Sequence, residues 1–415
     1  MGELRRSRLA AAMLGCLALG GAAVGQQKPA PGTTKDDDEV LKAGPVDPYT
    51  GGDKESMAAA GVVAYGPFPW ADFLTTTDID KVLGERRILW IETAHFRLGS
   101  GLKSAAWPEA PEKRKALQEE IRQLRKKLPK IPERPKKLDP WLRLHLYAQR
   151  VEACYADFLK LIGATDADFP ARGKAPREGA YLGMPDKFLL LVFQKKSDMA
   201  RYMDRFCGMK EDSSMRFYHD KTHQMLAGVS AEGLEGFDET ALHGHVVYAV
   251  MHNLLNGYNG FYYQLPLWFD EGVAHWYSRK VPSDVVNAQI RDDEAVAEDK
   301  QSDWPVKVRR RAQHVGAFFA FDAMAAWDKW EEMGYHAHSQ SWSRVDYLMS
   351  VDPEKVGLMI RELKKMPPSL DGKGIEQAAQ ARTLAKKLVF ELFGLDAAAF
   401  DEKWRDWVLK TYPKK

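Results

Sequence analysis

The chain has 415 residues, of which 45% are hydrophobic and 28% charged, so it can bury a substantial core over two or three subdomains. Lysine and arginine together number 60 against 58 aspartate and glutamate residues, which gives a net charge of +2. Such a balance provides no global attraction to nucleic acid or to an anionic membrane. The composition therefore predicts a globular protein that does not bind nucleic acid.

Residues 1–25 have the layout of a secretory signal peptide. Arg5, Arg6 and Arg8 precede an apolar stretch over 9–24 that ends in small residues. This stretch is shorter than the roughly 20 residues of a membrane span, and no other segment approaches that length without a charge. We expect an exported protein, periplasmic or extracellular, with no transmembrane span after the signal is removed.

Residues 26–60 are predicted to form a disordered linker. They carry proline, glycine and the acidic run 36–39, with few large apolar side chains. A segment of this composition buries too little apolar surface to offset the entropy lost on ordering. Cys154 and Cys207 remain after the signal, and an oxidising compartment allows either a disulfide between them or two free thiols.

The remaining chain is predicted to be an α/β half followed by a helical half. Content of β-branched and aromatic residues predicts strands at 88–98, 187–194 and 226–229. Apolar residues at helical spacing predict helices at 112–128, 141–162, 197–206, 315–330, 341–349, 353–366, 374–393 and 397–412. The expected fold class is therefore α+β.

The residues that could form a catalytic or metal-binding site lie between these two halves. A further helix is predicted over 238–257, with Asp238 as its N-cap. His245, Tyr248 and His252 are spaced by three and four residues, so they share one face of this helix.

A second helix is predicted to begin at Pro266, and it places Glu271 and His275 one turn apart on a common face. A mononuclear zinc hydrolase built on helices needs two histidines at i and i+4, with a glutamate beside the first to activate water. Its third ligand comes from another helix. Glu271 follows His252 by 19 positions, within the segment 268–274 (WFDEGVA).

This pattern resembles the gluzincin (peptidase MA-like) family, in which the glutamate ligand often lies 19 residues after the second histidine in a W-x-x-E-G-x-A segment. The likeness extends from about residue 88 to the C-terminus and is strongest over 240–280. It implies a zincin-like α+β lobe (61–260) with a small mixed sheet and an active-site helix. A mainly helical lobe (261–415) would complete the cleft.

The H-E-x-x-H metal motif of that family is incomplete here. With His252 as the second histidine, Tyr248 stands at the first histidine and Ala249 at the catalytic glutamate. Alanine cannot act as a general base, and a neutral tyrosine is a poor zinc ligand. His245 lies roughly 10 Å further along the helix axis, too far to share one ion with His252. We therefore expect a pseudo-peptidase to which no catalytic residue is assigned.

The resemblance also assigns supporting roles. In the family an acidic residue four positions after the glutamate ligand orients the first histidine. His275 stands there, so a hydrogen-bonded pair of Tyr248 and His275 is expected. Asp270 stands where a partner of His252 is expected. Two hypotheses stay open: a polar network without metal, or zinc held by His252, Glu271 and His275 in an altered geometry.

Tyr335, His336 and His338 fall where the family's C-terminal lobe reaches over the cleft, which makes them candidates for substrate contact. The leading functional expectation is an exported gluzincin-like protein without peptidase activity that binds a peptide or a cell-envelope component in its cleft. The alternatives are a zinc-dependent hydrolase with altered ligands and a purely structural or interaction protein.

Overall fold

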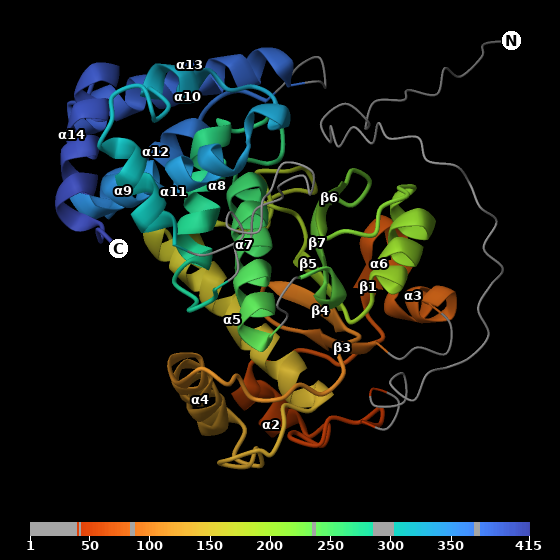
Figure 1. Ribbon diagram of the computed structural model, residues 1–415. Coiled ribbons are helices and arrows are strands. Elements are labelled where there is room, and N and C mark those ends of the chain that lie inside the picture. The colour runs from red at the N-terminus through yellow and green to blue at the C-terminus, as the bar shows by residue number, and fades with distance from the viewer. Residues whose placement is uncertain (1–39, 41–42, 84–87, 235–237, 285–302, 369–373) are drawn as a thin grey trace, which may run out of the picture.

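The computed structural model describes residues 40, 43–83, 88–234, 238–284, 303–368 and 374–415 (Figure 1). The predicted signal peptide and the first part of the predicted linker lie outside these residues. Within the described ranges, no helix is both long enough and apolar enough to cross a membrane.

A mixed sheet of five strands lies in the first half of the chain, in the order β3-β4-β5-β7-β6. The central strands β4, β5 and β7 are parallel to one another, and each edge strand is antiparallel to its neighbour. The strands are β3 (Leu89–Glu92), β4 (Phe96–Ser100), β5 (Phe188–Phe193), β6 (Met215–His219) and β7 (Gln224–Ser230), beside a separate pair, β1 (Pro69–Trp70) and β2 (Leu74–Thr75).

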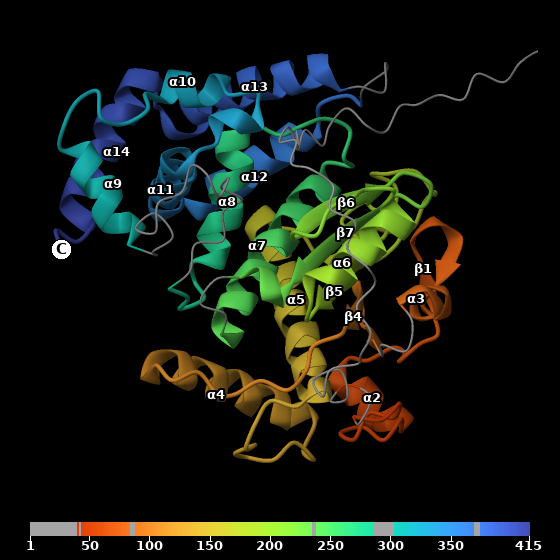
Figure 2. The same cartoon turned by 45° about the vertical axis from the view of Figure 1, so that its right-hand side comes forward.

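Both faces of the sheet are covered, as the alternation along β5 shows. Leu190 and Val192 enter the main core, whereas Leu189 and Leu191 enter a smaller core on the opposite face. The helices α5 (Pro140–Ile162) and α7 (Glu239–Tyr258) cover the first face, and α3 (Thr76–Leu83) and α6 (Lys196–Tyr202) cover the second (Figures 1 and 2).

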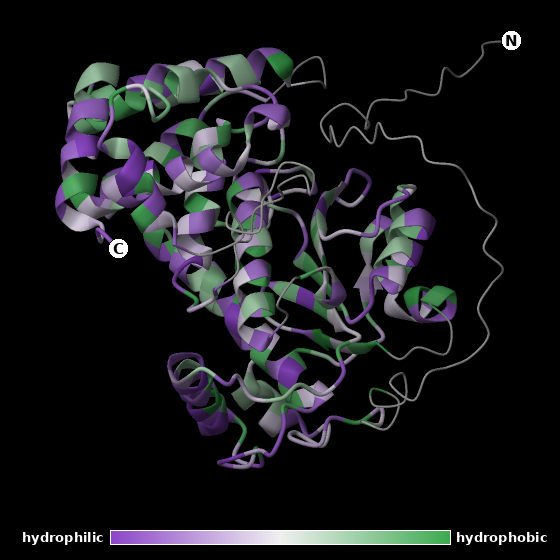
Figure 3. Ribbon diagram, viewed as in Figure 1, coloured by the Kyte–Doolittle hydropathy of each residue, from purple (hydrophilic) through white to green (hydrophobic). Residues whose placement is uncertain are grey.

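Of the helices not yet described, α2 and α4 pack on each other and α4 packs on α5, and the rest follow Pro266. The additional helices are α2 (Lys54–Ala60), α4 (Pro111–Lys127), α8 (Leu267–Ser278), α9 (Trp304–Ala312), α10 (Phe321–Ala326), α11 (Tyr335–Val351), α12 (Pro353–Lys364), α13 (Ile375–Phe393) and α14 (Ala397–Thr411). In Figure 3, α4 is largely hydrophilic, consistent with its four buried residues recurring on one face.

Most predicted elements are confirmed within a few residues, but three differ. The predicted strand 88–98 is a hairpin, because the chain reverses between Thr93 and Phe96. There the backbone N–H of Thr93 donates a hydrogen bond to the backbone oxygen of Phe96. The predicted helix 315–330 is reduced to α10. Helix α11 begins at Tyr335, six residues before the predicted start, and the edge strand β6 was not predicted.

The second part of the predicted linker is structured. Asp47 is buried and accepts hydrogen bonds from Thr50 and Tyr65, and its carboxylate lies 3.0 Å from Nε2 of His145 on α5. These polar anchors, which composition does not reveal, hold residues 43–60 against the fold. Cys154 and Cys207 are both free thiols in the structure.

Candidate functional site

Helix α7 forms the centre of the site. The Asp238 side chain accepts a hydrogen bond from the backbone N–H of Ala241 at 2.7 Å, which confirms the predicted N-cap. Every residue of α7 except His243 is buried. Gly257, the last position of the predicted helix, lies inside α7, which continues to Tyr258. A Cβ atom there would approach the Phe188 ring to 2.7 Å, so this glycine permits close packing of the helix on the sheet.

Helix α8 follows Pro266 as predicted, and it packs closely against α11. A Cβ atom on Gly272 would lie 2.5 Å from Val345 Cγ2 and 2.6 Å from the backbone oxygen of Ser341. The absence of a side chain at this position therefore lets α11 approach α8. Through this contact His338, in the first turn of α11, reaches Glu271 and His275.

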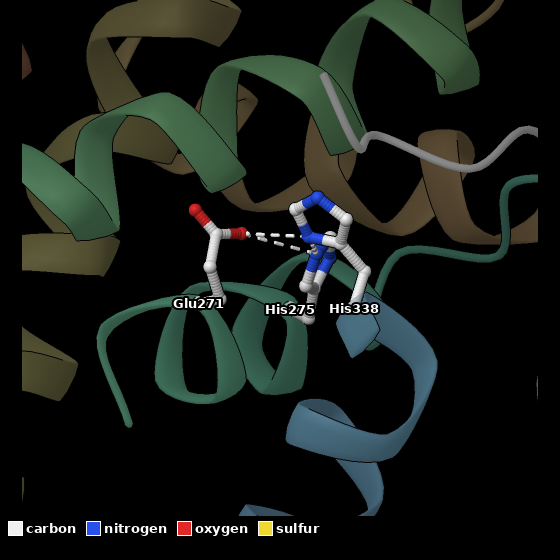
Figure 4. A group of neighbouring side chains, drawn as sticks. All are labelled: Glu271, His275 and His338. Atoms are coloured by element: carbon white, nitrogen blue, oxygen red, sulfur yellow. Dashed lines mark hydrogen bonds and ion pairs between the residues drawn. The ribbon is translucent and has the colours of Figure 1, made fainter. Parts of the chain in front are cut away.

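Glu271 is the hub of a cluster of side chains that we call the histidine cluster: Glu271, His252, His275 and His338. All four are at most 1% exposed. Oε2 of Glu271 lies 3.1 Å from Nδ1 of His338 and 3.3 Å from Nε2 of His275 (Figure 4). Those two ring nitrogens lie 3.1 Å from each other. Oε1 of Glu271 faces Nε2 of His252 at 3.3 Å.

His252 is oriented from behind by a carboxylate. Its Nδ1 lies 2.8 Å from Oδ1 of Asp270, and Asn256 donates from its side-chain amide to the same carboxylate. The resulting chain runs from Asn256 through Asp270 and His252 to Glu271. Asp270 thus contacts His252, the residue that the sequence analysis paired with it.

The electrostatics follow from burial and from this pairing. Burial alone raises the pKa of Glu271, but the neighbouring His252 and His338 hold it well below its usual range. Burial and Arg216 lower the pKa of His252, yet the carboxylates of Asp270 and Glu271 outweigh them and raise it.

His275 and Tyr248 shift in opposite directions. Burial lowers the pKa of His275 to about 4, with Glu271 opposing the shift. Burial, reinforced by the Glu271 carboxylate, raises the pKa of Tyr248 well above its usual value. At neutral pH these shifts favour an ionised Glu271 beside a neutral His275 and an un-ionised tyrosine.

The expected pair of Tyr248 and His275 is close but not hydrogen-bonded as predicted. Their ring centroids lie 4.8 Å apart, with the planes inclined at 33°. The Tyr248 hydroxyl instead donates to Oε2 of Glu271 at 2.7 Å.

His338 joins the cluster, although the sequence analysis considered it only for substrate contact. The sequence did not place His338 beside Glu271 and His275 because helix α11 was predicted to begin at 341, which left His338 in a loop. His336, two residues earlier, points elsewhere: its Nε2 lies 3.2 Å from Nη1 of Arg311. His245 lies one turn before Tyr248, its ring centroid 6.2 Å away, and burial lowers its pKa to about 4.

The donor set fits a zinc-class ion. Two imidazole nitrogens and one carboxylate oxygen, from Glu271, His275 and His338, converge within 4.8 Å of one another, and His252 is not part of this group. Among the described residues, three buried atoms of the cluster make no hydrogen bond: Nε2 of His252, Oε1 of Glu271 and Nε2 of His338.

Comparison of the sequence with models of known protein families and with curated proteins gives no match.

Proposed function

We propose that the chain is a gluzincin-like protein that has lost peptidase activity and is exported to bind a peptide or a cell-envelope component. Three features support a zincin-like scaffold: the mixed sheet with an antiparallel edge strand, the helix α7 packed on that sheet, and Glu271 presented to His252 by the next helix. The spacing between His252 and Glu271 supports the same relationship.

One observation carries the loss of activity. Tyr248 and Ala249 occupy the positions at which a gluzincin carries its first histidine and its general base, and the Tyr248 hydroxyl donates to Glu271. The other carboxylate beside the cluster, Asp270, is already bonded to His252 and Asn256. The two carboxylates of this region, Glu271 and Asp270, both face His252, so neither stands in for the general base that Ala249 lacks.

A peptidase assay on the purified full chain tests this proposal. With zinc supplied, the wild-type chain should not cleave casein or a mixed peptide library above the rate of a blank. The double variant Tyr248→His/Ala249→Glu rebuilds the motif and should gain zinc-dependent cleavage, whereas Tyr248→His alone, which lacks the base, should not. Cleavage by the wild-type chain that a chelator abolishes would contradict the proposal.

Ligand binding is tested separately. Fluorescence anisotropy of labelled peptides from a casein digest should rise on addition of the protein and fall again with unlabelled digest. The absence of any saturable binding, to these peptides or to envelope extracts, would favour the purely structural role.

A zinc-dependent hydrolase with altered ligands is the second candidate. The proximity of both His252 and His275 to the Glu271 carboxylate, 3.3 Å in each case, favours it. It requires a base other than residue 249, and the peptidase assay on the wild-type chain distinguishes it from the first candidate.

A further inference from the structure

Three atoms from two helices form a closed triangle in the core of the protein. They are Oε2 of Glu271, Nε2 of His275 and Nδ1 of His338, and the three sides measure 3.3, 3.1 and 3.1 Å. Figure 4 shows the carboxylate directed at both rings. We infer that this triangle binds one divalent transition-metal ion of the zinc class, through a ligand set that includes His338.

Protons alone cannot satisfy the triangle. Each side would need one proton lying between its two atoms, but an ionised carboxylate brings none and each ring nitrogen brings at most one. At most two sides can therefore be hydrogen bonds, and the third must oppose two N–H groups or two lone pairs. The Tyr248 hydroxyl already adds a proton to Oε2, so it does not relieve the contact between His275 and His338.

A cation satisfies all three atoms at once, because each can direct a lone pair at it. Ligand atoms at about 2.1 Å from a tetrahedral ion lie roughly 3.4 Å apart, and an octahedral arrangement brings them to about 3.0 Å. The observed sides fall between these values. Two imidazoles with one carboxylate are donors that zinc and neighbouring divalent metals prefer over calcium or magnesium.

The surroundings hold these ligands in place. Glu271 and His275 are one turn apart on α8, and the close contact at Gly272 fixes α11, which carries His338. Oε1 of Glu271 faces His252, which Asp270 orients in turn. His252 is thus a positioning residue that acts on the carboxylate and not on the ion.

This inference rests on the triangle and holds whether or not the chain is related to the gluzincins. The ligand set also differs from the gluzincin pattern, in which His252 would bind the metal directly. The two ligand sets predict different orders of effect among single substitutions.

The test is a titration of the chelator-treated full chain with Zn²⁺, followed by calorimetry and by elemental analysis after dialysis. We expect one ion per chain. His275→Ala and His338→Ala should each weaken binding by more than about 100-fold, and His252→Ala by about 10- to 100-fold. His243→Ala is the matched control: it removes an imidazole from α7 that lies beside Glu120, and it should leave affinity unchanged. Circular dichroism establishes that each variant is folded.

Cobalt spectra cover the case in which an alanine variant does not fold. Wild-type protein with Co²⁺ should show the visible bands of a low-symmetry site. His338→Cys should add the near-ultraviolet charge-transfer band of a cobalt–thiolate bond, which arises only if residue 338 is a ligand. The inference is overturned if the folded wild-type chain binds no Zn²⁺. It is also overturned if His252→Ala abolishes binding while His338→Ala does not, or if His338→Cys with Co²⁺ shows no such band.

Discussion

Helix α7 borders two buried clusters of charged side chains, and the charges are paired differently in each. At its first residue, Glu239 lies between Arg143 and Arg150 of α5, at 2.7 Å from each, and Arg150 also pairs with Glu120 of α4 at 2.7 Å. We call this group the arginine cluster. In the middle of α7, Tyr248 and His252 meet the hub Glu271 of the histidine cluster.

The difference lies in where the protons are. A guanidinium is permanently charged and offers only donors, so each carboxylate of the arginine cluster faces an N–H group of known position. Opposite charges face each other across that cluster, and these ion pairs tie α4, α5 and α7 together. The triangle of Glu271, His275 and His338 cannot assign its protons without conflict. A buried carboxylate that faces permanent cations indicates a structural role, whereas converging atoms that each offer a lone pair, with no such cation between them, indicate a metal ligand set.

The largest effect should follow from breaking the arginine cluster. Glu239→Gln leaves Arg143 buried without its carboxylate partner, and removing one partner of a buried ion pair typically costs about 3–5 kcal/mol. Urea denaturation measures the free energy of unfolding. The control is Glu119→Gln, which removes an exposed carboxylate paired with Arg122 on α4 and should change stability little. A loss of unfolding free energy below about 1 kcal/mol for Glu239→Gln would show that the arginine cluster does not have the stabilising role assigned to it.

The helix contact that assembles the histidine cluster should be the next most sensitive. Gly272→Ala forces a methyl group against Val345 and the backbone of Ser341, which should cost about 1–3 kcal/mol. Because the clash separates α8 from α11, it should also weaken Zn²⁺ binding. Gly334→Ala is the control, since a Cβ atom there meets nothing within 4 Å. Equal stability and metal affinity for the two variants would show that α11 is not held by the contact at Gly272.

Acid should weaken the arginine cluster. Burial raises the pKa of Glu239, but Arg143 and Arg150 outweigh it, so the folded-state pKa lies below the unfolded value. A depressed carboxyl pKa contributes stability that is present above the unfolded pKa, near 4.3, and is lost as pH falls through the folded pKa. The stability gap between wild type and Glu239→Gln should therefore be constant near neutral pH and narrow below about pH 4. Urea denaturation at several pH values measures it, and a gap that widens in acid would reverse the assigned sign.

The smallest change in the free energy of unfolding is expected for a substitution in the histidine cluster of the metal-free protein. In metal-free protein, His338→Leu removes one corner of the unsatisfied triangle and should alter the free energy of unfolding by less than about 1 kcal/mol. With Zn²⁺ at 100 times its dissociation constant, the wild-type chain should gain about 2.7 kcal/mol and the variant less than about 0.4 kcal/mol. Thermal and urea denaturation with and without metal provide both values. A cost of several kcal/mol without metal would show that the triangle is complete without an ion.

Local signals were sufficient for most of the helices. Asp238 and Pro266 mark the starts of α7 and α8, because an N-cap side chain and a proline in the first turn act within a few residues. Asp270 was paired correctly with His252 from the motif alone. Two boundaries failed: the turn between β3 and β4 contains no glycine or proline to mark it, and α11 begins six residues before its predicted start.

Helical spacing in the sequence was enough to place Tyr248 beside His252 on one helix face and Glu271 beside His275 on another, because residues three or four apart share a face. The resemblance to the gluzincins predicted that these two faces meet, as the contacts of Glu271 with Tyr248 and His252 confirm. Two features could be seen only in the folded chain: His338, 63 residues after His275, completes the triangle, and Asp47 anchors residues 43–60. These contacts depend on how helices approach one another in space, and the small size of Gly272 controls that approach without leaving any periodic pattern in the chain.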